Sequence, residues 1–210
     1  MLTQFFTIGI LMLLSAMLPG PDFACVTKNS ILYSRRAGIF TSIGITSAVM
    51  IHITYCIYGL AIIISRSILL FNMIKYIGAI YLIYLGITSL LLKHTEPNSA
   101  NISHQPLQKT DMSDWIAFRQ GFFCNILNPK ATLFFLAVFT MIIKPNTPIA
   151  WEIAYAIEML AIVLAWFCSL TLLLSHPRVL RLLNRVERYI AKILGVFLIG
   201  FGVALFFVKR

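Results

Sequence analysis

The chain has 210 residues, of which 60% are hydrophobic and 11% are charged, whereas ordinary soluble domains have roughly 45–50% and about 25%. With a mean hydropathy of +0.89, this composition excludes a water-soluble globular protein and predicts an integral membrane protein that crosses the bilayer several times as α-helices. The net charge of +10 does not indicate a nucleic-acid partner, because the basic residues lie between apolar runs instead of forming a basic domain.

Six apolar segments follow one another along the chain, and a run of about 20 apolar residues is enough to cross a bilayer core of about 30 Å. The long polar stretch 93–114 contains Pro97 and Pro106 and separates three segments from three as an expected cytoplasmic linker. We therefore predict an all-α membrane protein with six transmembrane helices. The expected spans are 4–34 with an interruption, 38–64, 68–92, 116–143, 149–174 and 190–208.

The first expected span is interrupted by the sequence Pro19-Gly20-Pro21. The two prolines remove backbone donors and break the helix, and the segment 4–34 is too long for one straight span of about 20 residues. The chain is therefore expected to unwind at the prolines and to restart as a second helical piece. Asp22 would then lie at the new helix N-terminus, where the backbone amides stabilise its negative charge.

A second break is expected within 116–143, in the sequence Asn125-Ile126-Leu127-Asn128-Pro129-Lys130. Pro129 interrupts the helix, and Lys130 places a cation at membrane depth, which is costly unless it faces an aqueous cavity or a counter-ion. A simple proline kink is the alternative for each break taken alone. Two breaks at similar positions of two halves, each beside an ionisable residue, predict a central binding site between them. Asp22 and Lys130 can pair there as a salt bridge.

Two further ionisable residues lie inside expected spans, His52 in 38–64 and Glu158 in 149–174. Both are surrounded by apolar residues, and either can titrate during a transport cycle. A single histidine inside a membrane helix is more often part of hydrogen-bonded packing, and this alternative stays open for His52. Glu158 is costlier to bury, which favours a functional role.

The two halves carry a faint internal repeat. Lys75-x-x-Gly78 in the third span is matched 117 residues later by Lys192-x-x-Gly195 in the sixth. With three spans in each half, the second copy must be inverted in the membrane. We therefore expect two inverted three-helix repeats, 1–92 and 115–210, in which the first and fourth helices are broken and the linker 93–114 lies between them.

The distribution of cationic residues predicts the orientation in the membrane. If both termini are outside, 11 lysines and arginines face the cytoplasm and five face the outside, with Lys130 inside a span, as the positive-inside rule requires. Five of the cytoplasmic residues recur at intervals of 3, 4, 3 and 4. This spacing predicts a basic helix near 177–190 along the anionic leaflet. Its residues are Arg178, Arg181, Arg185, Arg188 and Lys192.

The sequence lacks the residue patterns that are typical of metal and catalytic sites. The four cysteines are scattered without C-x-x-C spacing, which favours buried thiols over a metal site or a disulfide framework. There is no H-E-x-x-H or G-x-S-x-G motif. We therefore expect no metal, no cofactor and no catalytic residue. An ion channel or a cation exchanger stays open as an alternative, and a membrane-embedded enzyme built on Asp22, His52 and Glu158 as a minor one.

Two motifs surround the expected helix breaks. The first is Pro19-Gly20-Pro21-Asp22-Phe23-Ala24 with Val26, Thr27, Asn29 and Ser30; the second is Gly121-Phe122-x-x-Asn125-x-x-Asn128-Pro129-Lys130-Ala131 with Phe134-Phe135. Both resemble the signatures of the LysE/RhtB family of bacterial amino-acid exporters. The resemblance covers essentially the whole chain and is closer to the homoserine/threonine-type branch. It implies export of amino acids or related small zwitterions from the cytoplasm across the bacterial inner membrane, driven by the proton gradient.

The expected partners are a small amino-acid substrate, protons and membrane lipid. Gly78, Gly86, Gly195 and Gly200 can serve either a homodimer or the internal packing of the bundle. In the site, the helix end at Asp22 can meet the ammonium group of a zwitterion, and the Lys130 region its carboxylate. The candidate substrate or translocation residues are Pro19, Gly20, Pro21, Asp22, Asn29, His52, Asn125, Asn128, Pro129, Lys130 and Glu158.

Overall fold

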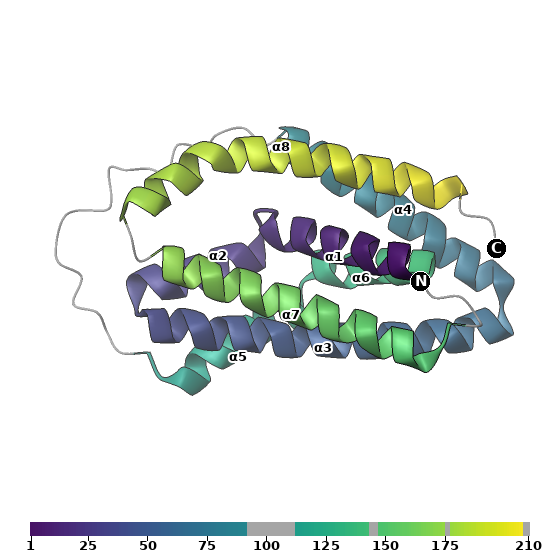
Figure 1. The fold of residues 1–210 in the computed structure, drawn as a ribbon, viewed down its shortest axis with the longest axis horizontal. Helices are drawn as coiled ribbons and strands as arrows, with labels where there is room; N and C mark the ends of the chain where they lie inside the picture. Colours follow the sequence, from purple (N-terminus) through teal and green to yellow (C-terminus); the bar gives the residue numbers. More distant parts are fainter. Residues whose placement is uncertain (92–111, 143–146, 175–176, 208–210) are drawn as a thin grey trace.

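A computed structural model of the chain describes residues 1–91, 112–142, 147–174 and 177–207, and all secondary structure in these ranges is α-helical. The helices are α1 (Leu2–Met17), α2 (Pro21–Leu32), α3 (Arg35–Arg66), α4 (Ile68–Leu91), α5 (Asp114–Ile126), α6 (Pro129–Ile142), α7 (Ile149–Leu173) and α8 (Pro177–Phe207). The long helices run along one another in an elongated bundle, and α1 begins at the same end at which α8 finishes (Figure 1).

Both helix breaks expected from the prolines are present. α1 and α2 differ in direction by 58° across a short break, and α5 and α6 differ by 57°. Pro21 and Pro129 each occupy the first position of the new helix. At that position the missing N–H is not needed and the fixed φ of proline suits the helical backbone. The same residue type therefore ends one helical piece and starts the next.

The lengths and hydropathy of the described helices agree with an all-α membrane protein. Three single helices are long and apolar enough to cross a bilayer, at Arg35–Gly59, Leu69–Leu91 and Ile149–Leu173, and each bent pair can form one further span. The apolar helix Ala191–Phe207, the described end of α8, is shorter. The arrangement as six spans in two inverted repeats stays a prediction.

One helix boundary differs from the expectation. The basic segment near 177–190 and the span expected at 190–208 form one continuous helix, α8. No glycine or proline lies between Arg178 and Leu194, so nothing in the local backbone ends the helix there. The side chains of residues 175–188 lie outside the described part of the structure, as does the linker 92–111. The position of the basic side chains at the membrane surface is therefore still a prediction.

The two halves of the chain interlock, because α3 packs against α5 and α7, while α4 packs against α8 and α6. A close crossing joins Gly44 of α3 to Gly121 of α5. A Cβ on Gly44 would overlap the carbonyl oxygen of Phe118, and a Cβ on Gly121 would overlap the carbonyl oxygen of Thr41. The missing side chains allow these two helices to approach backbone to backbone.

Three of the four glycines considered for a homodimer pack inside the chain. A Cβ on Gly78 would press on Ala137, and Gly86 and Gly195 face each other where α4 meets α8. Gly200 has open space around it. Internal packing therefore explains the first three glycines, and a homodimer stays a prediction.

Candidate substrate-binding site

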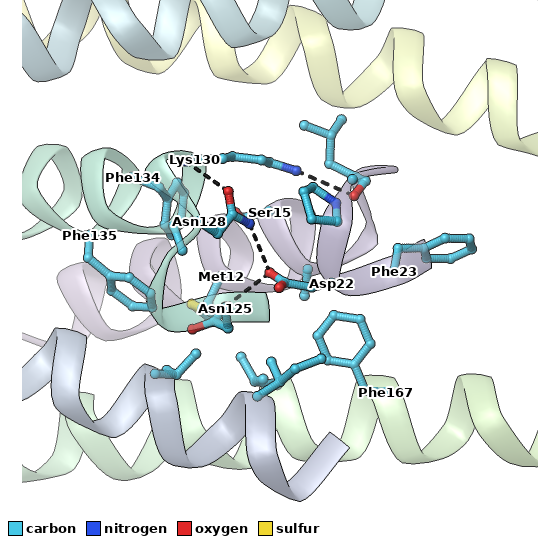
Figure 2. A pocket seen from close by; sticks show the side chains of 18 residues that line it. Met12, Ser15, Asp22, Phe23, Asn125, Asn128, Lys130, Phe134, Phe135 and Phe167 are labelled. Atoms are coloured by element: carbon cyan, nitrogen blue, oxygen red, sulfur yellow. Dashed lines mark hydrogen bonds between the residues drawn. The ribbon is translucent and has the colours of Figure 1, made fainter. Parts of the chain in front are cut away.

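The two helix breaks face each other inside the bundle, around a small cavity (Figure 2). The end of α1, the start of α2, the end of α5 and the start of α6 form its polar side, and α3 and α7 contribute apolar side chains. The cavity has a volume of about 30 Å³, about the share of one molecule in liquid water, roughly 30 Å³. Its polar lining residues are Ser15, Asp22, Asn125, Asn128 and Lys130.

Asp22 reaches from the first break to the second. It lies in the first turn of α2, after the N-cap residue Gly20, where free backbone N–H groups and the helix dipole stabilise a negative charge. Its Oδ2 accepts a hydrogen bond of 3.0 Å from Asn125 Nδ2 and a longer one of 3.4 Å from Asn128 Nδ2. The expected place of Asp22 at the start of the second helical piece is confirmed.

Lys130 makes the reciprocal contact, from the second break to the first. Its Nζ lies 3.4 Å from the carbonyl oxygen of Leu18, the residue that caps the end of α1. In an unbroken helix this carbonyl would accept from the backbone of Asp22, so the break leaves it free for the lysine. A Cβ on Gly20 would lie 3.1 Å from Lys130 Nζ, and the glycine therefore leaves room for the lysine to cross.

Asn128 fixes the geometry of the second break. Its Oδ1 accepts a hydrogen bond of 3.0 Å from the backbone N–H of Lys130, as an asparagine does when it caps a helix N-terminus. This bond turns the Nδ2 of the same amide toward Asp22 (Figure 2). One side chain thus joins the start of α6 to the start of α2.

Asp22 and Lys130 do not form a salt bridge at contact distance. In the described part of the chain, an ion pair within 4.0 Å joins Arg36 to Asp114 at the surface. Asp22 is held instead by two amides, and Lys130 by a main-chain carbonyl. Because both side chains line the same cavity, a negative and a positive group are available to a ligand that carries both charges.

His52 contacts the second break from outside the cavity lining. Its side chain is 1% exposed, its Nε2 lies 3.3 Å from the carbonyl oxygen of Asn125, and its Nδ1 lies 2.6 Å from the hydroxyl of Tyr55. Because a carbonyl oxygen only accepts, the contact with Asn125 places a hydrogen on Nε2, and the hydroxyl of Tyr55 can either donate to Nδ1 or accept from it. The ring also stacks on Phe135, which lines the cavity. His52 therefore positions lining residues and is not itself part of the lining.

Asn29 and Glu158 lie away from the cavity lining. Asn29 is buried between α2, α3 and α5, where its Nδ2 donates to Thr41 Oγ1 at 2.8 Å and to Gln120 Oε1 at 3.0 Å. Glu158 lies on α7 against Gly9 of α1, so close that a Cβ on that glycine would overlap its carboxylate. The structure therefore separates these two candidates from the two breaks. Pro19 and Pro129 are also outside the lining, whereas Gly20 and Pro21 belong to it.

The apolar wall of the cavity is absent from the candidates chosen by sequence. Ile45 and Val49 of α3 and Val163 and Phe167 of α7 line it, together with Phe134 of α6. The i, i+4 spacing of each pair indicates one helix face, but many apolar pairs in these helices share that spacing. The usable signals were the apolar residues of the two motifs that lie beside the breaks, namely Phe23, Ala131, Phe134 and Phe135.

The described residues contain no group of three or more histidine, cysteine, aspartate or glutamate side chains that could hold a metal ion.

A helical membrane protein with a charged site at two facing helix breaks has the architecture of a transport protein. Residues 13–208 match the LysE type translocator family, and the chain belongs to this family. It is therefore a translocator and not an enzyme. No solved structure matches the chain.

Relatives with curated names cover nearly the whole chain. The chain is 32% identical over 209 residues to the threonine efflux protein of Escherichia coli (strain K12), which covers 98% of both chains. It is 31% identical over 209 residues to the threonine efflux protein of Salmonella typhi, with the same coverage. The uncharacterized membrane protein YrhP of Bacillus subtilis (strain 168) is 30% identical over 193 residues, 89% of this chain and 90% of that one.

Proposed function

We propose that this protein is a secondary active transporter that exports amino acids from the cytoplasm across the bacterial inner membrane, driven by the proton gradient. The observation that carries the proposal is the pair of contacts between the two breaks. Lys130 at the second break contacts the backbone carbonyl of Leu18 at the first, and the side chain of Asn125 at the second donates to the carboxylate of Asp22 at the first. The family and its threonine efflux proteins support a small amino acid, such as threonine, as the substrate.

The two charges of the cavity match the two charges of an amino acid. Asp22 binds the ammonium group and Lys130 lies where it can meet the carboxylate. A simple cation or anion would compensate one of these side chains and leave the other uncompensated inside the membrane, which is unfavourable. The pair of charges therefore favours a zwitterion over the single ions that a channel or a cation exchanger would carry.

Asp22 also offers a simple way to couple export to the proton gradient. Its carboxylate can hold a substrate ammonium group or a proton, and the two compete. When the site faces the more acidic outside, a proton displaces the amino acid. When it faces the cytoplasm, the proton leaves and an amino acid binds. Each cycle then moves an amino acid outward and a proton inward. The carboxyl group of Asp22 is protonated, and therefore uncharged, while the empty site turns back from the outside to the cytoplasm.

Transport requires the cavity to widen, because its volume of about 30 Å³ is on the scale of single water molecules, and an amino acid is several times larger. The breaks between α1 and α2 and between α5 and α6 are the points at which the helical backbone is already interrupted. We place the alternation of access in a rocking of repeat 1–92 against repeat 115–210, with both termini outside.

Reconstituted proteoliposomes test the proposed function. Vesicles loaded with labelled threonine are expected to lose it faster when the exterior is made acidic, and a protonophore should abolish the acceleration. An empty vesicle preparation serves as the control for passive leakage. Flux of sodium or potassium without amino-acid flux would indicate a channel or a cation exchanger, and the absence of amino-acid flux would overturn the proposal.

A further inference from the structure

Two buried oxygen atoms of the cavity-lining residues have no hydrogen-bond partner, Asp22 Oδ1 and Asn125 Oδ1. The Asn125 side chain is 3% exposed. Its Nδ2 donates to Asp22 Oδ2, and this contact determines which end of the amide is which, because the opposite orientation would place its oxygen against the carboxylate. The partnerless atom of Asn125 is therefore an acceptor, as is that of Asp22.

The remaining amide and ammonium groups of the cavity already have partners. Asn128 caps α6 through its oxygen and donates to Asp22 through its nitrogen, and Lys130 Nζ contacts the carbonyl of Leu18. Burying an acceptor without a donor is unfavourable by itself. A ligand that brings hydrogen-bond donors to Asp22 and Asn125 would satisfy both atoms at once. An ammonium group brings both donors and the positive charge that Asp22 requires.

We infer that Asp22 and Asn125 bind the nitrogen of the substrate through two of its N–H groups, so that the site accepts primary and secondary amines and rejects tertiary and quaternary ones. The inference rests on the proposed function and adds the chemical class that the site selects. Asn125 is the specificity-determining residue, because Asp22 alone would attract any cation. Methylation of the nitrogen tests this directly, since it keeps the positive charge and removes donors one at a time.

Competition for threonine exchange in proteoliposomes of the full chain measures the selectivity. The competitors are threonine, N-methylthreonine, which keeps two N–H donors, and N,N-dimethylthreonine, which keeps one. The second methylation is expected to raise the half-inhibitory concentration by about 10-fold or more beyond the first, because it takes one hydrogen bond to a charged group from the site. α-Methylthreonine, which adds a methyl group but keeps all three donors, controls for bulk and should resemble N-methylthreonine.

If each of the two N-methylations raises the half-inhibitory concentration by the same factor, equal to the factor for α-methylthreonine, the inference is overturned. Amino-acid export itself is not affected by that result. No exchange of any amino acid would overturn both. In Asn125→Ala the second methylation should raise the half-inhibitory concentration much less, because Asp22 alone needs only one N–H group. Asn29→Ala is the matched control, since Asn29 is also buried with a partnerless Oδ1 but lies outside the cavity lining. It should keep the full effect of the second methylation. The ratio of the half-inhibitory concentrations of two competitors does not depend on how much protein inserts. If the second methylation raises the half-inhibitory concentration as much in Asn125→Ala as in the unchanged protein, the inference is also overturned.

Discussion

Replacing Asp22 by asparagine removes a charge and changes one cavity atom from an acceptor to a donor. In Asp22→Asn the amide oxygen can keep the place of Oδ2, to which Asn125 and Asn128 donate. The amide nitrogen then takes the place of the partnerless Oδ1. The fold loses the interaction of the charge with the first turn of α2, about 0.3–1 kcal/mol, and part of the strength of the hydrogen bonds to it. We therefore expect the variant to insert into the membrane normally.

The effect on transport is expected to be larger than the effect on the fold. The ammonium group of the substrate would meet an N–H group in place of a carboxylate oxygen. A hydrogen bond to a charged group contributes about 1.5–3 kcal/mol, which corresponds to a factor of roughly 10 to 150 in an equilibrium constant. Flux per inserted molecule should fall by about 10-fold or more, both in driven export and in threonine exchange without a gradient. Asp22→Glu keeps the charge but displaces it, and should retain part of the activity.

Flux per inserted molecule in proteoliposomes, with the protein quantified in the same vesicles, measures the effect. Asp114→Asn is the matched control, because Asp114 lies in the first turn of α5 and binds Arg36 at the surface, outside the cavity lining. It should keep near-normal flux. Loss of driven export with normal exchange would assign Asp22 to the proton alone. Near-normal rates of both processes in Asp22→Asn would refute the reasoning and leave Asp22 as a residue that stabilises a helix terminus.

Three further predictions concern the backbone and the orientation. Pro129→Ala should lower flux per inserted molecule far more than it lowers abundance, because α5 and α6 can then join across the break; unchanged flux would make Pro129 an ordinary kink. Gly44→Val should lower the thermal unfolding temperature in detergent, since overpacking typically costs about 1–3 kcal/mol, whereas Gly200→Val, which has open space, should not; equal shifts would contradict the close crossing. Reporters fused after Lys93 and Arg185 should report cytoplasm, and a cytoplasmic C-terminus would overturn the six-span arrangement; fusions after Ser67, Asn146 and Arg210 should report the outside.

The sequence by itself determined the helical class of the protein and the two positions at which helices break. Pro21 and Pro129 act on the backbone within one turn of their own positions, so both breaks were predicted at the residues where the structure has them. Apolar length predicted the spans for the same local reason. The structure joins 177–190 to the last helix without a break, because a basic face changes the environment of a helix without ending its hydrogen bonding; the position of the basic segment along the membrane surface stays a prediction.

Only the tertiary structure decided which of these local features meet. The sequence allowed a salt bridge between Asp22 and Lys130. In the structure, Asp22 accepts from the amides of Asn125 and Asn128, and Lys130 contacts the carbonyl of Leu18. The structure also places His52 against the backbone of Asn125 and leaves both His52 and Glu158 outside the cavity lining. Contacts between residues about 100 positions apart, as between Asp22 and Asn125, depend on how whole helices pack. Most buried polar groups pair with a group that helix packing brings near them, and a helix's own residues do not encode which group that will be.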